Sequence, residues 1–176
     1  MFNDKYKNKM KLPTAEYWIQ HYNLQPHPEG GFFRETYRSV LETEKKNLPI
    51  GYDDDRHLST SIYFLLRSGE KSKFHRLRSD EMWYYHYGSA LKIILIDQEG
   101  NKHNRLLGPN IEKAEKLQVL VPGGTVFAAE VSEKESYSLI GCMVSPGFEY
   151  ADFELFAQDD LIQAYPQHRE LITRFT

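Results

Sequence analysis

A histidine and a glutamate in the middle of the chain have the side chains and the spacing needed for acid–base chemistry. If residues 74–77 form a strand, His75 lies on one face of it, because the side chains of a strand alternate between two faces. After a turn, the same alternation places Glu81, Trp83 and Tyr85 together on the next strand. We therefore expect two antiparallel neighbours to bring His75 and Glu81 into one space lined by aromatic rings.

An imidazole beside a carboxylate is a common form of general base, because the carboxylate orients the ring and raises its basicity. In this interpretation His75 removes a proton, Glu81 orients the imidazole, and Tyr85 acts as the opposing acid. Removing a proton beside a carbonyl group and returning it on the other face would epimerise or isomerise a small substrate. The structural alternative is a mutually satisfied pair of His75 and Glu81 in a filled aromatic core, with Trp83 as packing rather than a stacking platform.

Residues 32–38 are a second source of polar groups. Alternation puts Arg34 on one face and Glu35 on the other, so each face mixes charged and aromatic side chains. A buried charge without a partner is costly, so an inward Arg34 or Glu35 would need an ion pair or a ligand. An inward Arg34 could hold an anionic or enolate oxygen. The alternative is an edge strand with both charges in solvent.

The composition favours one β-rich domain. The chain has 176 residues, of which 40% are hydrophobic and 14% aromatic, and this suffices for a single core over residues 12–176. Residues 1–11 are polar and rich in lysine, and we expect them to form a flexible tail. A net charge of −3 gives no basis for binding nucleic acid.

The sequence shows no sign of membrane insertion or secretion. Its apolar stretches are too short to span a bilayer, and the first residues lack the core of a signal peptide. The single cysteine, Cys142, excludes an intramolecular disulfide and lies in an apolar run that predicts a buried, inert thiol. We expect a soluble, cytoplasmic protein that does not bind membranes.

Short runs with alternating or apolar character predict an all-β fold with helices only near the ends. A helix is expected over residues 13–23, with Thr14 as its N-cap, and two more over residues 159–165 and 166–175. The expected strands cover residues 32–38, 58–66, 74–77, 81–87, 91–96, 104–108, the two halves of 117–129, 136–145 and 152–156. Their number and shortness favour a single jelly roll.

The central stretch resembles the first motif of the cupin superfamily, Gly-x5-His-x-His-x3,4-Glu-x6-Gly. The matching residues are Gly69, His75, Glu81 and Gly88, with Leu77 at the second histidine position. The second motif, Gly-x5-Pro-x-Gly-x2-His-x3-Asn, is matched by Pro122 and Gly124, with Phe127 at its histidine position. Two of the three metal-binding histidines of the superfamily are therefore replaced by apolar residues.

The chain as a whole resembles one cupin branch, the DUF985 (Cupin_5) family. The resemblance rests on residues 27–39, 61–66, 74–83, 121–124 and 144–154, and it extends over about residues 12–172. It implies a jelly-roll cupin that forms a homodimer, with a pocket similar to that of sugar epimerases. We expect Arg34, Glu35, Trp83 and Phe127 to contact a small carbohydrate-like or carbonyl ligand.

Three functions remain open at this stage. The first is a metal-independent epimerase or isomerase, with His75, Glu81 and Tyr85 as its catalytic residues and no cofactor. The second is a cupin that binds a small molecule without catalysis. The third is a metal-dependent cupin enzyme in which His75 and Glu81 hold a divalent metal weakly, because two protein ligands make a poor site.

Overall fold

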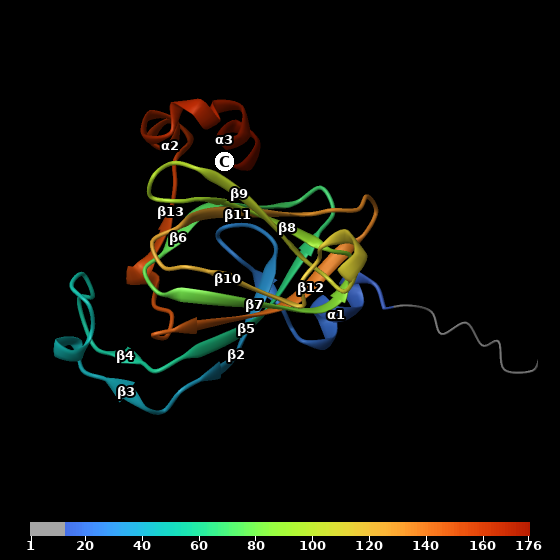
Figure 1. Cartoon of the computed structure of the whole chain (residues 1–176). Helices are drawn as coiled ribbons and strands as arrows, with labels where there is room; N and C mark the ends of the chain where they lie inside the picture. Colours follow the sequence, from blue (N-terminus) through green and yellow to red (C-terminus); the bar gives the residue numbers. More distant parts are fainter. Residues whose placement is uncertain (1–12) are drawn as a thin grey trace, which may run out of the picture.

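The computed structural model describes residues 13–176, so the expected flexible tail over residues 1–11 lies outside the described residues. Two β-sheets face each other (Figure 1). Across the larger sheet the strands are β1 (Gln25–Pro26), β2 (Phe32–Arg38), β5 (Thr60–Arg67), β12 (Tyr137–Ser145), β7 (Asp80–Gly88) and β10 (Gln118–Val121). Across the smaller sheet they are β13 (Phe153–Leu155), β6 (Lys71–Leu77), β11 (Val126–Val131), β8 (Leu91–Ile96) and β9 (Lys102–Leu107).

Every pair of hydrogen-bonded neighbours in these sheets is antiparallel. The predicted all-β jelly roll is therefore confirmed, although its strands form two facing sheets rather than one closed ring. A short third sheet, β3 (Glu42–Thr43) with β4 (Arg56–His57), extends away from the other two (Figure 1).

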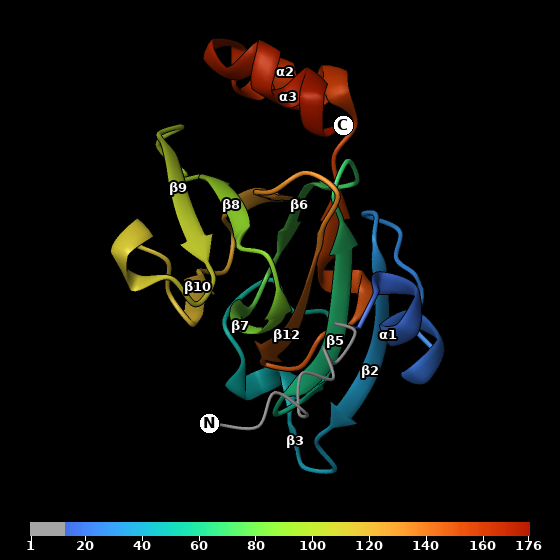
Figure 2. The same cartoon turned by 90° about the vertical axis from the view of Figure 1, so that its right-hand side faces the viewer.

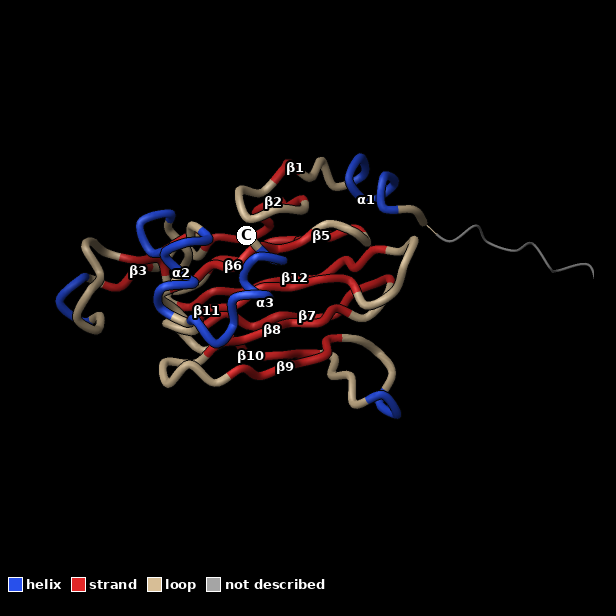
Figure 3. Tube along the Cα trace, turned by 90° about the horizontal axis from the view of Figure 1, so that it is seen from above, coloured by secondary structure: helices blue, strands red, loops and turns tan. Residues whose placement is uncertain are grey.

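Helices pack on the outer faces of both large sheets. The helix α1 (Ala15–His21) begins after Thr14, whose hydroxyl accepts a hydrogen bond from the Tyr17 amide as expected of an N-cap. It packs on the six-stranded sheet against Leu65 and Leu139. Two C-terminal helices, α2 (Gln158–Ala164) and α3 (Arg169–Phe175), cover the five-stranded sheet (Figures 2 and 3). Within residues 13–176, every helix is too short or too polar to cross a membrane.

The main core lies between the two sheets. Phe64 and Trp83 enter it from the six-stranded sheet, and Leu91, Ile93 and Phe127 enter it from the five-stranded sheet, all of them at most 2% exposed. Each sheet therefore has one face toward this core, and a helix packs on part of its other face, as expected from the alternation of side chains along the strands.

The strands that carry His75 and Glu81 are not hydrogen-bonded neighbours, so this prediction was wrong. Strand β6 belongs to the five-stranded sheet and β7 to the six-stranded sheet, and the chain crosses from one to the other between Leu77 and Asp80. The turn is a crossover between layers rather than a hairpin. Consequently His75 and Glu81 enter the interior from opposite sheets.

A β-bulge in β2 changes which of its charged residues faces inward. The pairing with β5 shifts between Glu35 and Tyr37, so Thr36 is an extra residue. An extra residue reverses the alternation beyond it. Arg38 therefore joins Glu35 on the inner face, whereas strict alternation had placed these two residues on opposite faces.

Candidate functional site

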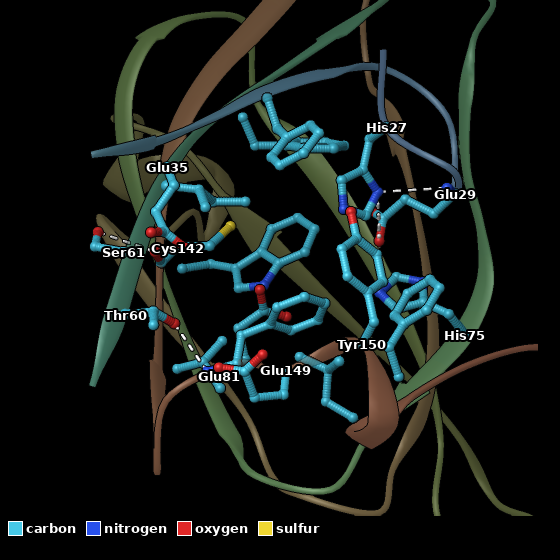
Figure 4. Close-up of a pocket in the computed structure, with 18 of the residues that line it drawn as sticks. His27, Glu29, Glu35, Thr60, Ser61, His75, Glu81, Cys142, Glu149 and Tyr150 are labelled. Atoms are coloured by element: carbon cyan, nitrogen blue, oxygen red, sulfur yellow. Dashed lines mark hydrogen bonds and ion pairs between the residues drawn. The ribbon is translucent and has the colours of Figure 1, made fainter. Parts of the chain in front are cut away.

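A cavity lies between the two sheets where β2, β5 and β7 face β6 and β13. Its volume is about 160 Å³, below the roughly 300–1,000 Å³ of sites for drug-sized ligands. Its wall is mainly aromatic and aliphatic, with rings from Phe33, Phe64, Trp83, Phe148 and Phe153. In Figure 4, His27, Glu29 and His75 lie on one side of this cavity and Glu35, Ser61 and Cys142 on the other. The dimensions fit a small molecule.

The loop before β2 brings the side chain of Glu29 into the cavity. The backbone of this loop touches β6 at Gly30, where φ is +114° and a Cβ atom would lie 2.1 Å from the Lys71 carbonyl oxygen. The Lys73 amide donates a hydrogen bond to the Glu29 carbonyl oxygen at 2.8 Å. Because the loop is held against β6, the Glu29 carboxyl reaches His75 on that strand.

Glu29 and His75 lie within ion-pair distance of each other. His75 Nδ1 lies 2.7 Å from the Lys73 carbonyl oxygen, which can only accept, so Nδ1 carries a hydrogen. His75 Nε2 lies 3.1 Å from Glu29 Oε2. Burial lowers the pKa of His75 and raises the pKa of Glu29, and both shifts favour the uncharged form of the group. Ser72 Oγ donates to Glu29 Oε1 at 2.8 Å, and His27 Nδ1 lies 3.4 Å from Glu29 Oε2.

Glu81 differs from Glu29 in having an oxygen without a partner. Its side chain lines the cavity and is buried, yet Oε2 makes no hydrogen bond to any residue of the described chain. Burial raises the pKa of Glu81 to about 7. The Trp83 indole is close enough to favour the charged form, but its N–H is not in hydrogen-bonding geometry. Glu81 can therefore both release and accept a proton near neutral pH.

Three charged side chains form the rim of the cavity. Arg38 donates to both carboxylate oxygens of Glu35, from Nε at 3.0 Å and from Nη2 at 2.7 Å. Its Nη1 donates to Glu149 Oε1 at 2.5 Å. These ion pairs raise the pKa of Arg38, led by the hydrogen bond to Glu35. The single guanidinium is thus shared by two carboxylates, which leaves the rim with a net negative charge.

A buried ion pair holds the segment that carries Glu149 and Tyr150. Arg56, 3% exposed, contacts Asp152 through Nε at 2.6 Å and Nη2 at 3.0 Å. Arg78 adds a contact to the same carboxylate at 3.2 Å. Asp152 ends the short 3₁₀ turn that begins at Tyr150, so this pair fixes the rim against the β3–β4 extension.

The side chains of this cavity do not fit a resident metal ion. Both ring nitrogens of His75 are engaged, one by a carbonyl oxygen and the other by Glu29. The two neighbouring positions where metal-binding cupins have histidine are Leu77 and Phe127. In the described part of the chain, no group of three His, Cys, Asp or Glu residues is arranged to hold a metal.

Four of the residues that the sequence singled out line the cavity: His75, Glu81, Trp83 and Glu35. Phe127 does not line it. Its ring is fully buried and packs on the His75 imidazole, with the ring centres 4.0 Å apart. The expected pairing of His75 with Glu81 also needs correction, because the carboxyl within ion-pair distance of His75 is that of Glu29.

Two predicted site residues lie away from the cavity. Arg34 is exposed on the outer face of β2, where Nη1 donates to the Tyr22 carbonyl oxygen at 3.2 Å. The Tyr85 hydroxyl donates to the Gly88 carbonyl oxygen at 2.6 Å, and its ring packs at the edge of the main core. Neither side chain is placed to contact a ligand that lies beside His75.

Sequence reasoning missed Glu29, His27, Arg38 and Glu149 as members of the site. The first two lie in a loop, and the third becomes inward only because of the bulge. The sequence did carry a signal for the loop, because His27 and Glu29 are directly followed by two glycines at positions 30 and 31. Both glycines have positive φ, and glycine allows another part of the backbone to approach closely. No pattern in the sequence indicated that Cys142 would face the cavity beside Glu81, where burial raises the pKa of its thiol.

Two facing antiparallel sheets around a small internal site define a jelly-roll protein of the cupin type. Residues 16–156 match the family described as Cupin superfamily (DUF985). The chain belongs to this family, as the motifs had indicated.

Similar proteins come from a yeast and from bacteria. An uncharacterized protein of Saccharomyces cerevisiae, YML079W, is 30% identical over 151 residues, which cover 81% of this chain and 75% of the yeast protein. The crystal structure of protein SO0799 from Shewanella oneidensis is 42% identical, with a TM-score of 0.82 and coverage of 94% of this chain and 98% of that one. Oxalate decarboxylase from Bacillus subtilis is 16% identical over 86% of this chain and 36% of its own, with a TM-score of 0.53, and shows the fold alone.

Proposed function

We propose that the cavity binds a small carbonyl or carbohydrate-like compound and catalyses proton transfer on it, as a metal-independent isomerase or epimerase. The observation that carries this proposal is Glu81: a buried carboxyl with an oxygen that has no hydrogen-bond partner, in a mostly apolar cavity. An acid–base group is most effective when its pKa is near the working pH, and the pKa of Glu81 is about 7.

The proposed step begins with the Glu81 carboxylate. It takes a proton from the carbon beside the substrate carbonyl, and the bonding electron pair moves to the carbonyl oxygen to give an enolate. In an α-hydroxy carbonyl substrate, the hydroxyl proton of the same carbon then passes to the former carbonyl oxygen. Glu81 delivers its proton to the former carbonyl carbon, which regenerates the carboxylate and leaves a new carbonyl group at the neighbouring carbon. In this proposal Glu81 replaces His75 as the base, because both nitrogens of His75 are engaged.

The test measures exchange of the hydrogen on the carbon beside the carbonyl group rather than formation of a product. Small aldoses and ketoses are incubated with the protein in D₂O, and proton NMR measures loss of the C–H signal beside the carbonyl. We expect exchange above the buffer rate, and we expect Glu81→Gln to reduce it by about 100-fold or more. Glu112→Gln is the matched control, because Glu112 is exposed and outside the cavity.

Two outcomes would contradict the proposal. If Glu81→Gln exchanges as fast as the unaltered protein, Glu81 is not the base. If compounds bind and none exchanges, the protein is a binding cupin without proton-transfer activity. Exchange that a chelator abolishes and an added divalent metal restores would establish the metal-dependent alternative.

We also propose that two copies associate along β2. Strand β1 pairs with only Phe32 and Phe33, so the outer edge of β2 from Arg34 to Arg38 is open in the described chain. Such an edge favours pairing with another strand. Val40 and Leu41, which follow it, are 93% and 64% exposed.

We expect a dimeric mass in solution. The double variant Val40→Glu/Leu41→Glu should shift the protein to a monomer, whereas the distant Ile111→Glu should not. A monomeric unaltered protein would refute the association.

A further inference from the structure

Carboxyl groups outnumber cationic groups around the cavity. Four carboxyl groups line it, those of Glu29, Glu35, Glu81 and Glu149, and they face one guanidinium, that of Arg38. The two histidines that also line it do not offset this excess, because burial is the main cause that lowers the pKa of each. Glu29 is satisfied by its own neighbours, as described above.

Arg38 is not available to a ligand with a negative charge. Its Nε and Nη2 donate to Glu35, its Nη1 donates to Glu149, and Nη2 also lies 3.4 Å from the Phe148 carbonyl oxygen. An anion at the rim would have to break these bonds and would then meet two carboxylates. In the interior it would meet Glu81. Electrostatic repulsion therefore disfavours an anionic ligand at both places.

The aromatic wall of the cavity favours a ligand with a positive charge. Rings of Phe64, Trp83, Phe148, Tyr150 and Phe153 line the cavity. The face of an aromatic ring attracts a cation, and the attraction is strongest where the cation has lost its water. Rings combined with one buried carboxylate are the chemistry by which proteins hold substituted ammonium groups.

We propose that the cavity selects a small organic cation, an ammonium-bearing compound whose charge is neutralised by Glu81 and whose methyl or methylene groups contact the aromatic wall. This inference rests on the proposed function, because it narrows the ligand of the same cavity from carbonyl compounds in general to those that carry an amine. A bound ammonium also keeps Glu81 ionised, which is the form that accepts a proton.

Three probes of nearly equal shape test the charge preference: choline, its uncharged carbon analogue 3,3-dimethylbutan-1-ol, and the anion 3,3-dimethylbutanoate. Binding to the full chain is measured by calorimetry at pH 8, where Glu81 is mainly ionised. We expect choline to bind at least about tenfold more tightly than the alcohol, and the anion to bind more weakly than either. Glu81→Gln should remove the advantage of choline over the alcohol, while Glu112→Gln should retain it.

A second variant reverses the selection. Glu35→Gln/Glu149→Gln frees the Arg38 guanidinium from both carboxylates, so the affinity for 3,3-dimethylbutanoate should rise by about tenfold. The inference is overturned if the alcohol or the anion binds as tightly as choline, or if choline shows no binding at millimolar concentration. Deuterium exchange of an uncharged sugar without preference for cations would sink this inference while leaving the proposed function intact.

Discussion

Glu29 and Glu81 face the same cavity, and each is 6% exposed. Glu29 is surrounded by partners: the imidazoles of His75 and His27 and the hydroxyl of Ser72. Glu81 enters from the opposite sheet and keeps one oxygen without a partner. Two acids of the same type and burial can therefore have different roles, because hydrogen-bond satisfaction rather than burial decides which is free to react.

The largest effect should come from removing the satisfied acid. Glu29→Ala leaves His75 Nε2 and Ser72 Oγ buried without partners, so we expect the free energy of unfolding to fall by about 4 kcal/mol. Denaturant unfolding measures this change. Ser72→Ala, which removes one hydroxyl from the same network, should cost only about 1 kcal/mol. If Glu29→Ala lowers the free energy of unfolding by less than about 1 kcal/mol, the network contributes little to stability.

Glu81→Gln should instead increase the free energy of unfolding at neutral and higher pH. The pKa of Glu81 is raised from 4.5 to about 7 in the folded protein. Between these values the folded state retains a proton that the unfolded state has lost, so stability falls as pH rises. The glutamine side chain of the variant carries no titratable proton in this pH range. The variant should therefore be more stable than the unaltered protein at pH 8, by up to about 3 kcal/mol, and the difference should vanish near pH 4.

The experiment compares unfolding free energies of the two proteins at several pH values. The contributions of Glu29 and of the histidines are common to both proteins and largely cancel in the difference. A difference that does not change with pH would mean that Glu81 is ionised in the folded state as it is in the unfolded chain.

Tyr85→Phe should have the smallest effect. It removes only the hydrogen bond from the Tyr85 hydroxyl to the Gly88 carbonyl oxygen, so we expect a loss of about 1 kcal/mol in stability. Because Tyr85 lies outside the cavity wall, deuterium exchange should stay within about twofold of the unaltered rate. A loss of exchange comparable to that of Glu81→Gln would restore Tyr85 as the acid expected from alternation along the strand.

The sequence predicted the fold well and the site only partly. Period-two alternation and turn residues identified every strand except the two-residue strands β1, β3 and β4, and the N-cap at Thr14 located the first helix. They could not show that residues 78–79 join different sheets, because a short turn can either close a hairpin or cross between layers. The bulge at Thr36, which brings Arg38 inward, has no signature in local composition. Glu29 depends on a loop whose contact with β6 is non-local.

The most direct test of this account is a pH titration of the Glu81 carboxyl by ¹³C NMR, with the signal assigned by its absence in Glu81→Gln. We expect a midpoint near pH 7, because the Glu81 carboxyl is buried and one of its oxygens has no partner. A midpoint near 4.5, the ordinary value for glutamate, would contradict it. Glu81 would then be an ordinary solvated carboxylate, and neither the proton transfer nor the selection of a cation would have its present basis.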